Sequence, residues 1–282
     1  MTDTAFQTQY RQEFIYGFEQ RQSLLRTTVT TEAVIKGNQA VFLVADSNSA
    51  TAVTRGVNGL IPARADNNNQ NTATLLEWHD LVRKTGFNVF ASQGDQRRIM
   101  QETTMAVVNR KIDDDIITTL NTGTVTAGSS TTIPGVDLFQ SGRVKLSNAE
   151  VPWDSNITLL CQPSFLAYLE QAPEFASADY IDLRPYAGQD MSWRDKPMAY
   201  RWRNTLICEH PNLPGKGTSS EISFMYHKNA LGHAANTDGM QNVVGYDKEQ
   251  DYSYARCTIF MGSVLMQNAG DVVITHDGSA YA

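Results

Sequence analysis

The sequence predicts an α+β fold, in which one long helix lies beside several strands. Residues 92–120 repeat apolar side chains at spacings of three and four, which is typical of a helix with one buried face. Short runs of β-branched and aromatic residues, among them 157–161 and 222–226, are typical of strands. Residues 45–74 are mostly small and polar, and loops this long inside a domain are usually functional or disordered. Since apolar runs flank this stretch, we expect it to project from the body and to be completed by another molecule.

Composition limits the class of protein. A chain of 282 residues is long enough for one large domain or two closely connected ones. It has 23 basic and 30 acidic residues, a net charge of −7 and a pI of about 5.2. Proteins that read nucleic-acid sequences usually carry a basic patch and a high pI, so we do not expect sequence-specific binding. Negative charge would instead keep a protein from sticking to nucleic acid that it surrounds.

The cysteines and the N-terminal residues indicate the compartment. Cys161, Cys208 and Cys257 lie far apart in apolar surroundings, so we expect buried, reduced thiols and no disulfide framework. The first residues lack the basic and apolar regions of a signal peptide. No apolar run approaches the ~18 residues of a membrane span. We therefore expect a protein of cytosolic origin without a membrane partner.

The N-terminal third predicts a helix followed by strands. Residues 6–26 interleave apolar side chains with charged and amide ones, as an amphipathic helix does. Residues 27–31 are mostly β-branched and predict an extended segment. Apolar runs predict strands on both sides of the polar stretch, at residues 40–44 before it and at residues 75–78 and 87–90 after it.

The helix over residues 92–120 has recognisable ends. Ser92 is the expected N-cap, and Asp95 lies three residues later, in the position of a capping-box partner. Gly123 is the expected residue that ends the helix in a left-handed conformation. The apolar stripe between these ends consists of Met105, Val108, Ile112, Ile116 and Leu120.

The C-terminal half alternates short helices with strands. We expect helices over residues 136–146, 164–171 and 227–235, and strands over residues 157–161, 222–226, 252–261, 264–267 and 272–274. Residues 191–204 are rich in Arg and aromatic side chains. Their alternation fits a half-buried strand better than a platform for single-stranded nucleic acid.

Side chains that could carry chemistry do not form a recognisable site. Residues 113–115 are three aspartates that point about 100° apart on the predicted helix, so they cannot converge on one metal. We expect them to form a solvated face or intersubunit salt bridges. His227 and His233 lack the spacing of a zinc-binding helix, and residues 214–218 lack the pattern of a phosphate loop. We therefore expect no catalytic residue, no metal and no cofactor.

Several phrases in the C-terminal half resemble those of one protein family. Residues 224–232 read FMYHKNALG, residues 210–214 read HPNLP, and GSVLM at 262–266 is followed by GDVVI at 270–274. They occur in a chain with an N-terminal arm, a polar hairpin, a long single helix, a mixed region and closing strands, in that order. This combination resembles the major capsid proteins of tailed bacteriophages, which have the Hong Kong 97-type fold.

The resemblance implies five parts and a set of partners. The parts are an N-terminal arm (1–39), an extended loop with its flanking strands (40–90), a peripheral domain with the spine helix (91–133), an axial domain (134–241) and closing strands that return to the peripheral domain (242–282). Such a subunit would assemble in the host cytoplasm as hexamers and pentamers, forming the icosahedral shell of a virion around double-stranded DNA. The other implied partners are a portal protein, a separate scaffolding protein and a decoration protein.

The extended loop is the implied contact between subunits. Its expected contact residues are Arg55, Val57, Leu60, Ile61, Arg64 and Asp66. Some members of the family join subunits covalently through a Lys in this loop, but this chain has no Lys between Lys36 and Lys84. We therefore expect a shell without crosslinks, in which the loop pairs its strand edges with a neighbour.

Two other classes of protein are alternatives. Another virion component, such as a tail-tube or decoration protein, would also bind partners through the polar stretch, although such proteins are usually shorter and richer in strands. A hydrolase would use residues 113–115 together with histidines distant in the sequence.

Overall fold

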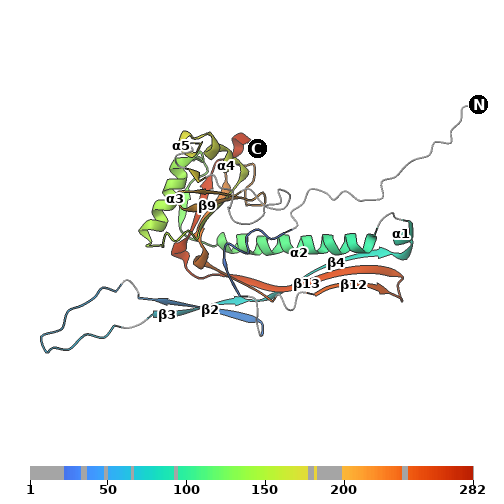
Figure 1. Cartoon of the computed structure of the whole chain (residues 1–282), viewed down its shortest axis with the longest axis horizontal. Helices are drawn as coiled ribbons and strands as arrows, with labels where there is room; N and C mark the ends of the chain where they lie inside the picture. Colours follow the sequence, from blue (N-terminus) through green and yellow to red (C-terminus); the bar gives the residue numbers. More distant parts are fainter. Residues whose placement is uncertain are drawn as a thin grey trace, which may run out of the picture.

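The structure is a computed structural model that describes residues 22–32, 37–47, 50–64, 67–91, 95–176, 181–182, 199–236 and 241–281. It contains two larger sheets, a long helix along the first of them, and a two-stranded hairpin that extends past the end of that first sheet (Figure 1). The α+β class predicted from the sequence is confirmed.

β13 (Tyr252–Leu265) is the central strand of the first sheet. One of its edges pairs antiparallel with the whole of β4 (Leu76–Thr85). The other edge pairs, also antiparallel, with β12 (Gln241–Asp247) and then with β11 (Leu231–Ala235). β1 (Thr30–Glu32) adds to β11 as a parallel strand. The first sheet is therefore built outward from one long strand.

α2 (Gln96–Leu120) lies along one face of this sheet. Asp95 caps it, because its carboxylate accepts hydrogen bonds from the backbone N–H groups of Arg97 and Arg98. The start predicted at Ser92 is therefore wrong: the carboxylate of Asp95 is itself the cap, placed at the positive end of the helix dipole.

The apolar stripe of α2 forms the main core with β13. Four of its five predicted members are buried: Val108, Ile112, Ile116 and Leu120. They pack in one cluster with Cys257, Ile259 and Met261 of β13. Met105 is 38% exposed and lies outside this cluster.

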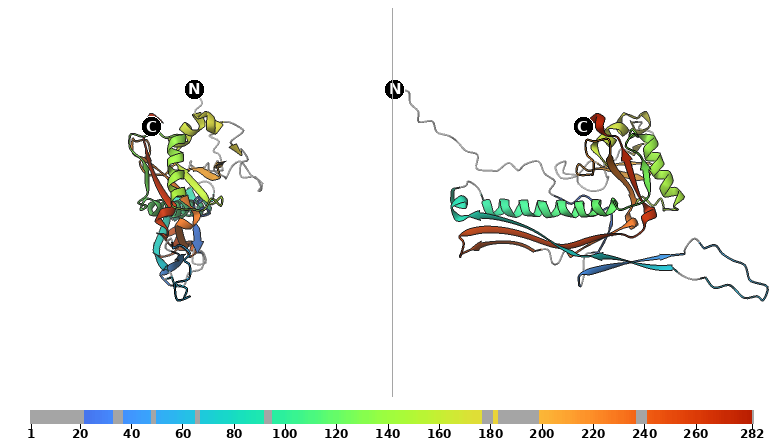
Figure 2. Two further views of the ribbon diagram at one scale, coloured as in Figure 1. Left: turned by 90° about the vertical axis from the view of Figure 1, so that its left-hand side faces the viewer. Right: turned by 180° about the vertical axis from the view of Figure 1, so that it is seen from behind.

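The second sheet has the strand order β5-β14-β10-β6-β9-β8-β7. The bounds are β5 Thr126–Gly128, β6 Ile157–Cys161, β7 Ile181–Asp182, β8 Ala199–Trp202, β9 Thr205–Glu209, β10 Glu221–His227 and β14 Asp271–His276. Its helices are α3 Val136–Asn148, α4 Pro163–Gln171 and α5 Pro173–Ala176. This part stands beside the C-terminal end of α2 (Figure 2). The strand predicted over residues 157–161 is confirmed as β6, and all five of its residues are buried.

Several predicted elements are wrong. Residues 87–90 belong to a short helix, α1 (Gly86–Ala91), and not to a strand. The helix predicted over residues 227–235 is a single 3-10 turn followed by β11. The ring of His227 accepts a hydrogen bond from the N–H of Asn229 (3.1 Å), which turns the chain so that β11 can pair with β13.

The closing strands and the N-terminal segment also differ from the predictions. Residues 252–261 and 264–267 were expected as two strands, but β13 continues through Gly262 because β11 pairs with it there. The helix predicted over residues 6–26 lies mostly outside the described residues, and its described end, from Gln22, is not helical.

Asp113 attaches the N-terminal segment to α2. Its carboxylate accepts hydrogen bonds from the hydroxyl of Ser23 (2.6 Å) and from the backbone N–H groups of Leu24 (2.9 Å) and Leu25 (3.2 Å). His210 Nε2 lies 3.6 Å from the same carboxylate. Burial alone would raise the pKa of Asp113, but the interactions with His210, Leu24 and Ser23 hold that pKa below its ordinary value. The expected solvated acidic face is therefore wrong for Asp113, which is buried.

Asp271 is a buried carboxylate at the end of α2. Neither of its oxygens has a hydrogen-bond partner within the described part of the chain. A Cβ on Gly123 would lie 2.5 Å from one of these oxygens, so the glycine is needed for this close approach. Gly123 does not adopt the left-handed conformation expected from the sequence. Burial raises the pKa of Asp271 to about 8.

Removing the carboxylate of Asp113 should release the N-terminal segment. We expect Asp113→Ala to lower the free energy of unfolding by about 2–4 kcal/mol, because it leaves buried donors unpaired. Asp114→Ala is the matched control, since the side chain of Asp114 is 60% exposed where it pairs with Lys111 and its loss should cost less than ~1 kcal/mol. Urea unfolding and proteolysis at residues 22–29 measure both effects. Equal losses in the two variants would contradict this role.

Asp271 should make stability depend on pH. Its pKa is raised from 3.8 to about 8 on folding, so the folded chain takes up a proton between these values. The contribution of Asp271 to stability is therefore most favourable below pH 4 and becomes less favourable as the pH rises toward 8. We expect Asp271→Asn to raise the free energy of unfolding on the order of 2–4 kcal/mol at pH 7, with little change at pH 4. Thermal unfolding at both pH values measures this, and an equal effect at both would contradict it.

Candidate assembly surface

The hairpin is the element that projects furthest from the body. β2 (Gln39–Asp46) and β3 (Asn67–Thr74) pair antiparallel along their whole length. The right-hand view in Figure 2 shows the pair as a narrow ribbon that extends past the end of the first sheet. The strand predicted at residues 40–44 is confirmed. The polar stretch also contains a strand, β3, which its composition did not predict.

Small residues at the root of the hairpin allow it to lie flat on the first sheet. Gly232 and Gly262 lie on one face of the β11–β13 pair, next to Ala234. The ring of Phe42 covers Gly232 so closely that a Cβ there would lie 2.9 Å from three ring atoms. The backbone carbonyl of Thr74 lies against Gly262 in the same way. Side chains larger than hydrogen would therefore push the hairpin away from the sheet.

The tip of the hairpin contains a tight turn. The N–H of Gly59 donates to the carbonyl of Gly56 (2.8 Å), and the N–H of Gly56 donates to the carbonyl of Leu60 (3.0 Å). Gly59 has a positive φ of 71°. This is the pattern of a three-residue hairpin loop closed by a G1 bulge, which requires glycine at the left-handed position. The turn holds Val57 at its apex, fully exposed.

The structure brings most of the predicted contact residues together on this tip. Arg55, Val57, Leu60, Ile61 and Arg64 are all exposed on residues 50–64. Leu60 is 74% and Ile61 67% exposed, which is unusual for large apolar side chains that gather on one loop. Asp66 lies outside the described residues.

Two features of this surface were missed in the sequence. Val41 and Leu43 are exposed on one face of β2, and the sequence carries no signal for this, because residues 40–45 are all apolar and do not alternate with polar residues. The second feature is β3, an exposed strand rich in amide side chains, which are more typical of loops.

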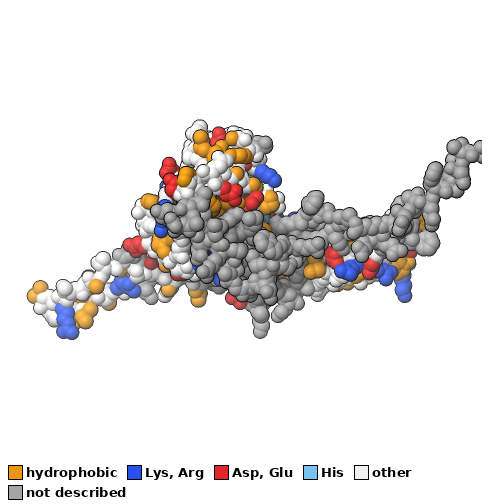
Figure 3. Space-filling model, turned by 45° about the horizontal axis from the view of Figure 1, so that its top comes forward, with side chains coloured by type: hydrophobic (Ala, Val, Ile, Leu, Met, Phe, Trp, Pro, Cys, Tyr) orange, Lys and Arg blue, Asp and Glu red, His pale blue; other side chains and the backbone are white. Residues whose placement is uncertain are grey.

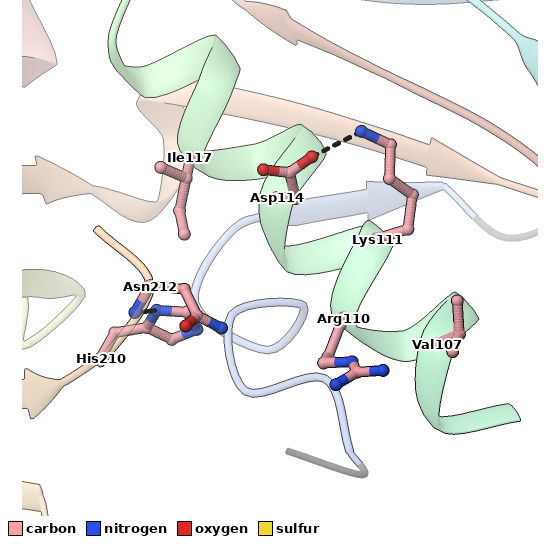
Figure 4. A pocket seen from close by; sticks show the side chains of 7 residues that line it. All are labelled: Val107, Arg110, Lys111, Asp114, Ile117, His210 and Asn212. Atoms are coloured by element: carbon pink, nitrogen blue, oxygen red, sulfur yellow. Dashed lines mark hydrogen bonds and ion pairs between the residues drawn. The ribbon is translucent and has the colours of Figure 1, made fainter. Parts of the chain in front are cut away.

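The acidic cluster on α2 does not form a chemical site. Asp113 binds the N-terminal segment, and Asp115 accepts a hydrogen bond from Ser263 (2.5 Å). Asp114 alone faces a groove of about 360 Å³ between α2 and the loop at His210 (Figure 4). Lys111 in that groove is already paired with Asp114 and stacks on the ring of Trp78.

A second group of side chains has the serine–histidine–acid arrangement of a hydrolase triad, but it is buried and a substrate cannot reach it. The hydroxyl of Ser223 lies 3.0 Å from Nε2 of His276, whose Nδ1 lies 3.6 Å from Glu221. Glu221 also bonds the hydroxyl of Ser164 and the backbone N–H of Gly217. All three members of the group are buried, so they connect four segments of the second sheet and do not meet solvent.

The described residues also lack a metal site and a membrane-spanning helix. They contain no group of three or more His, Cys, Asp or Glu side chains placed to hold a metal ion. In the same part of the chain, every helix is too short or too polar to span a membrane.

These observations define a class of protein. The chain is elongated, and four large exposed apolar side chains lie on a projecting loop with charged and polar neighbours (Figure 3): Val53, Val57, Leu60 and Ile61. An exposed apolar surface of this kind marks a subunit that associates with other molecules.

Comparison with known proteins identifies the family. The model of the phage capsid protein family matches residues 2–278, so the chain belongs to that family. A comparison with curated proteins gave no significant match.

Solved structures share the fold. A chain from Mycobacterium phage Che8 has a TM-score of 0.74 and 15% identity, covering 97% of this chain and 98% of that one. A capsid chain of Ralstonia phage GP4 has a TM-score of 0.71 and 10% identity, with 98% and 96% covered. A capsid chain of cyanophage Pam1 has a TM-score of 0.71 and 11% identity, with 99% and 100% covered. The capsid fold predicted from the sequence is thus confirmed, and a tail-tube or decoration protein is not favoured.

Substitution at the root should displace the hairpin. We expect Gly262→Ala to lower the free energy of unfolding by about 1–3 kcal/mol, because its Cβ meets the backbone of Thr74. Hydrogen exchange in β2 and β3 should become faster. Gly135→Ala is the control, since its Cβ would meet nothing within 4 Å. Unchanged exchange in the Gly262 variant would show that the root does not depend on this contact.

Proposed function

We propose that this chain is the major capsid protein of a tailed phage and that its copies form the icosahedral shell around double-stranded DNA. Its membership of the phage capsid family supports this proposal. The observation that carries it is the projecting hairpin, whose apolar tip has no core of its own. Hexamers and pentamers of one chain require heterologous contacts that close by symmetry, and a projecting arm is suited to such contacts.

The proposed role of the tip is to bind a neighbouring subunit. Val57, Leu60 and Ile61 would each contribute about 1.5–3 kcal/mol when buried. Part of that gain is offset by the entropy lost on association, so one tip gives a weak contact and many tips give a stable shell. Arg55, Arg64 and Asp66 would orient the tip through polar contacts. Because no Lys lies between Lys36 and Lys84, we propose that the contact is not covalent.

The proposed peripheral and axial domains correspond largely to the first and second sheets. Residues 91–133 would form most of the peripheral domain and residues 134–241 the axial domain, as the resemblance implies. The boundaries need refinement at three strands. β5 in residues 91–133 and β14 in residues 242–282 pair with each other in the second sheet, whereas β11 in residues 134–241 pairs with β13 in the first. We therefore propose that residues 126–128 and 271–276 act with the axial domain and residues 231–235 with the peripheral domain.

The remaining proposals concern the setting. We propose assembly in the host cytoplasm with a separate scaffolding protein and a portal protein, and a decoration protein on the finished shell. The net charge of −7 supports a shell that encloses DNA without binding it tightly. The burial of the Ser223 and Asp113 groups supports a purely structural role without catalysis.

Charged substitutions at the tip should prevent assembly without unfolding the subunit. We expect Val57→Asp combined with Leu60→Asp to abolish particles, because the tip would carry charge into the contact. The unfolding midpoint should not change, since both side chains are exposed in the free subunit. Electron microscopy and sedimentation measure particle formation.

The control uses an exposed apolar residue elsewhere. Val144 on α3 is 53% exposed, so Val144→Asp adds a similar charge outside the tip and should leave assembly intact. Normal particles from the double tip variant would overturn the proposed role of the tip. A folded chain that never forms particles with its phage partners would overturn the proposed function itself.

A further inference from the structure

We propose that the free edge of β3 is where a second copy of this chain adds one of its own strands, and that the amide side chains of β3 hydrogen-bond to that neighbour. This inference rests on the proposed function and identifies which edge of the hairpin carries the pairing.

The sequence of β3 is unusual for a strand. Residues 67–71 read NNNQN, five amide side chains in succession. Asn is depleted in strands, because its side chain competes for hydrogen bonds with the backbone. Where the intrinsic preference of a segment disagrees with its observed conformation, a functional role is expected. Nothing in the fold of the single chain accounts for this run.

The amides have few partners within the subunit. The side-chain amide of Asn71 donates to the carbonyl of Met266 at the root (3.4 Å). Further out, Asn68, Asn69 and Gln70 are exposed. Within the described part of the chain, the side chains of residues 67–70 make no hydrogen bond. The four amide side chains of residues 67–70 are therefore available to hydrogen-bond to another molecule.

The backbone of β3 is also half unpaired. Among the described residues it pairs with β2 alone. The N–H of Leu75 donates to the carbonyl of Asn38 (2.9 Å), so these residues form a hydrogen-bonded pair at the base of the hairpin. Bonded and non-bonded pairs alternate in an antiparallel ladder. The N–H and C=O groups of Asn68, Gln70 and Thr72 consequently point away from β2, to the free edge.

The side chains favour the edge of β3 over the opposite edge of β2. An amide carries both donors and an acceptor, so a row of them can bond to different arrangements of polar groups. Stacked strands use Asn and Gln in this way, as ladders of amide hydrogen bonds. The corresponding outward positions of β2 include Val41 and Leu43, which have no hydrogen-bonding side chain. A neutral polar edge can also pair with neighbours in slightly different settings without a large electrostatic cost.

The occupant is a second copy for a physical reason. An open strand edge is an aggregation hazard unless it is covered, and the hairpin extends past the rest of its own subunit (Figure 1). In a shell of identical chains, each hairpin meets an adjacent copy, and strand addition covers the edge. Pairing through amides and backbone groups should respond little to salt, unlike a contact made by Arg55 and Arg64.

Proline substitutions can test which edge pairs. Leu43 and Gln70 are direct partners in the hairpin, and the N–H of each points to the outside. Gln70→Pro removes an outward donor of β3 and Leu43→Pro removes one of β2, while a proline at either edge is tolerated in the hairpin. We expect Gln70→Pro to reduce particle yield roughly tenfold or more, at low and at high salt, and Leu43→Pro to leave most of it. The double variant Asn68→Thr, Gln70→Thr keeps the backbone donors and should give an intermediate loss.

Hydrogen exchange provides a second measurement. The N–H groups of Gln70 and Thr72 should exchange fast in the free subunit and slowly in the particle, whereas those of Asn69 and Asn71 should be protected in both. Loss of particles with Leu43→Pro but not with Gln70→Pro would move the pairing to β2 and overturn the inference. Normal assembly of both proline variants, with failure of the tip variants, would overturn strand addition at this hairpin and leave the proposed capsid function standing.

Discussion

The packing of α2 against β13 is the contact on which the rest of the structure depends. Val108, Ile112, Ile116 and Leu120 are buried, and burial of each such side chain contributes about 1.5–3 kcal/mol. β13 in turn carries β4 on one edge and β11 and β12 on the other. Because β4 leads directly from the hairpin and α2 leads directly to the second sheet, both distant parts are oriented by this one helix–strand contact.

The β11–β13 pair serves two interfaces with its two faces. The face toward α2 carries large apolar side chains such as Leu231 and Met261, which are buried in one cluster with the helix. The other face is flattened by Gly232, Ala234 and Gly262, so it receives the hairpin through a shallow cluster of small residues. The hairpin is thus positioned by the body but contributes little to its stability, which suits an element that binds elsewhere.

The sequence predicted the elements with strong periodicity and failed where tertiary contacts decide. The stripe of α2 and the fully apolar β6 were found because burial imposes their patterns. β11 was mistaken for a helix, since three of its five residues are Gly or Ala, without β-branched side chains, and the segment is a strand that pairs with β13. Val57, Leu60 and Ile61 were singled out because large apolar side chains are conspicuous in a polar stretch, and their role as contact residues stays a prediction. β3 was missed because its amides favour loops, and only pairing with β2 makes it a strand.

The attachment of the N-terminal segment has a consequence for synthesis of the chain. Ser23 and Leu24 bind Asp113, and the hydroxyl of Thr28 lies 2.6 Å from that of Tyr226, which follows it by 198 residues. A ribosome adds about 5–20 residues per second, so this segment leaves the ribosome roughly 10–40 s before its last partner exists. The contact between Thr28 and Tyr226 therefore forms only after residue 226 has been made. A subunit in which residues 22–29 must wait for so distant a partner cannot present its finished surface to other copies before that point.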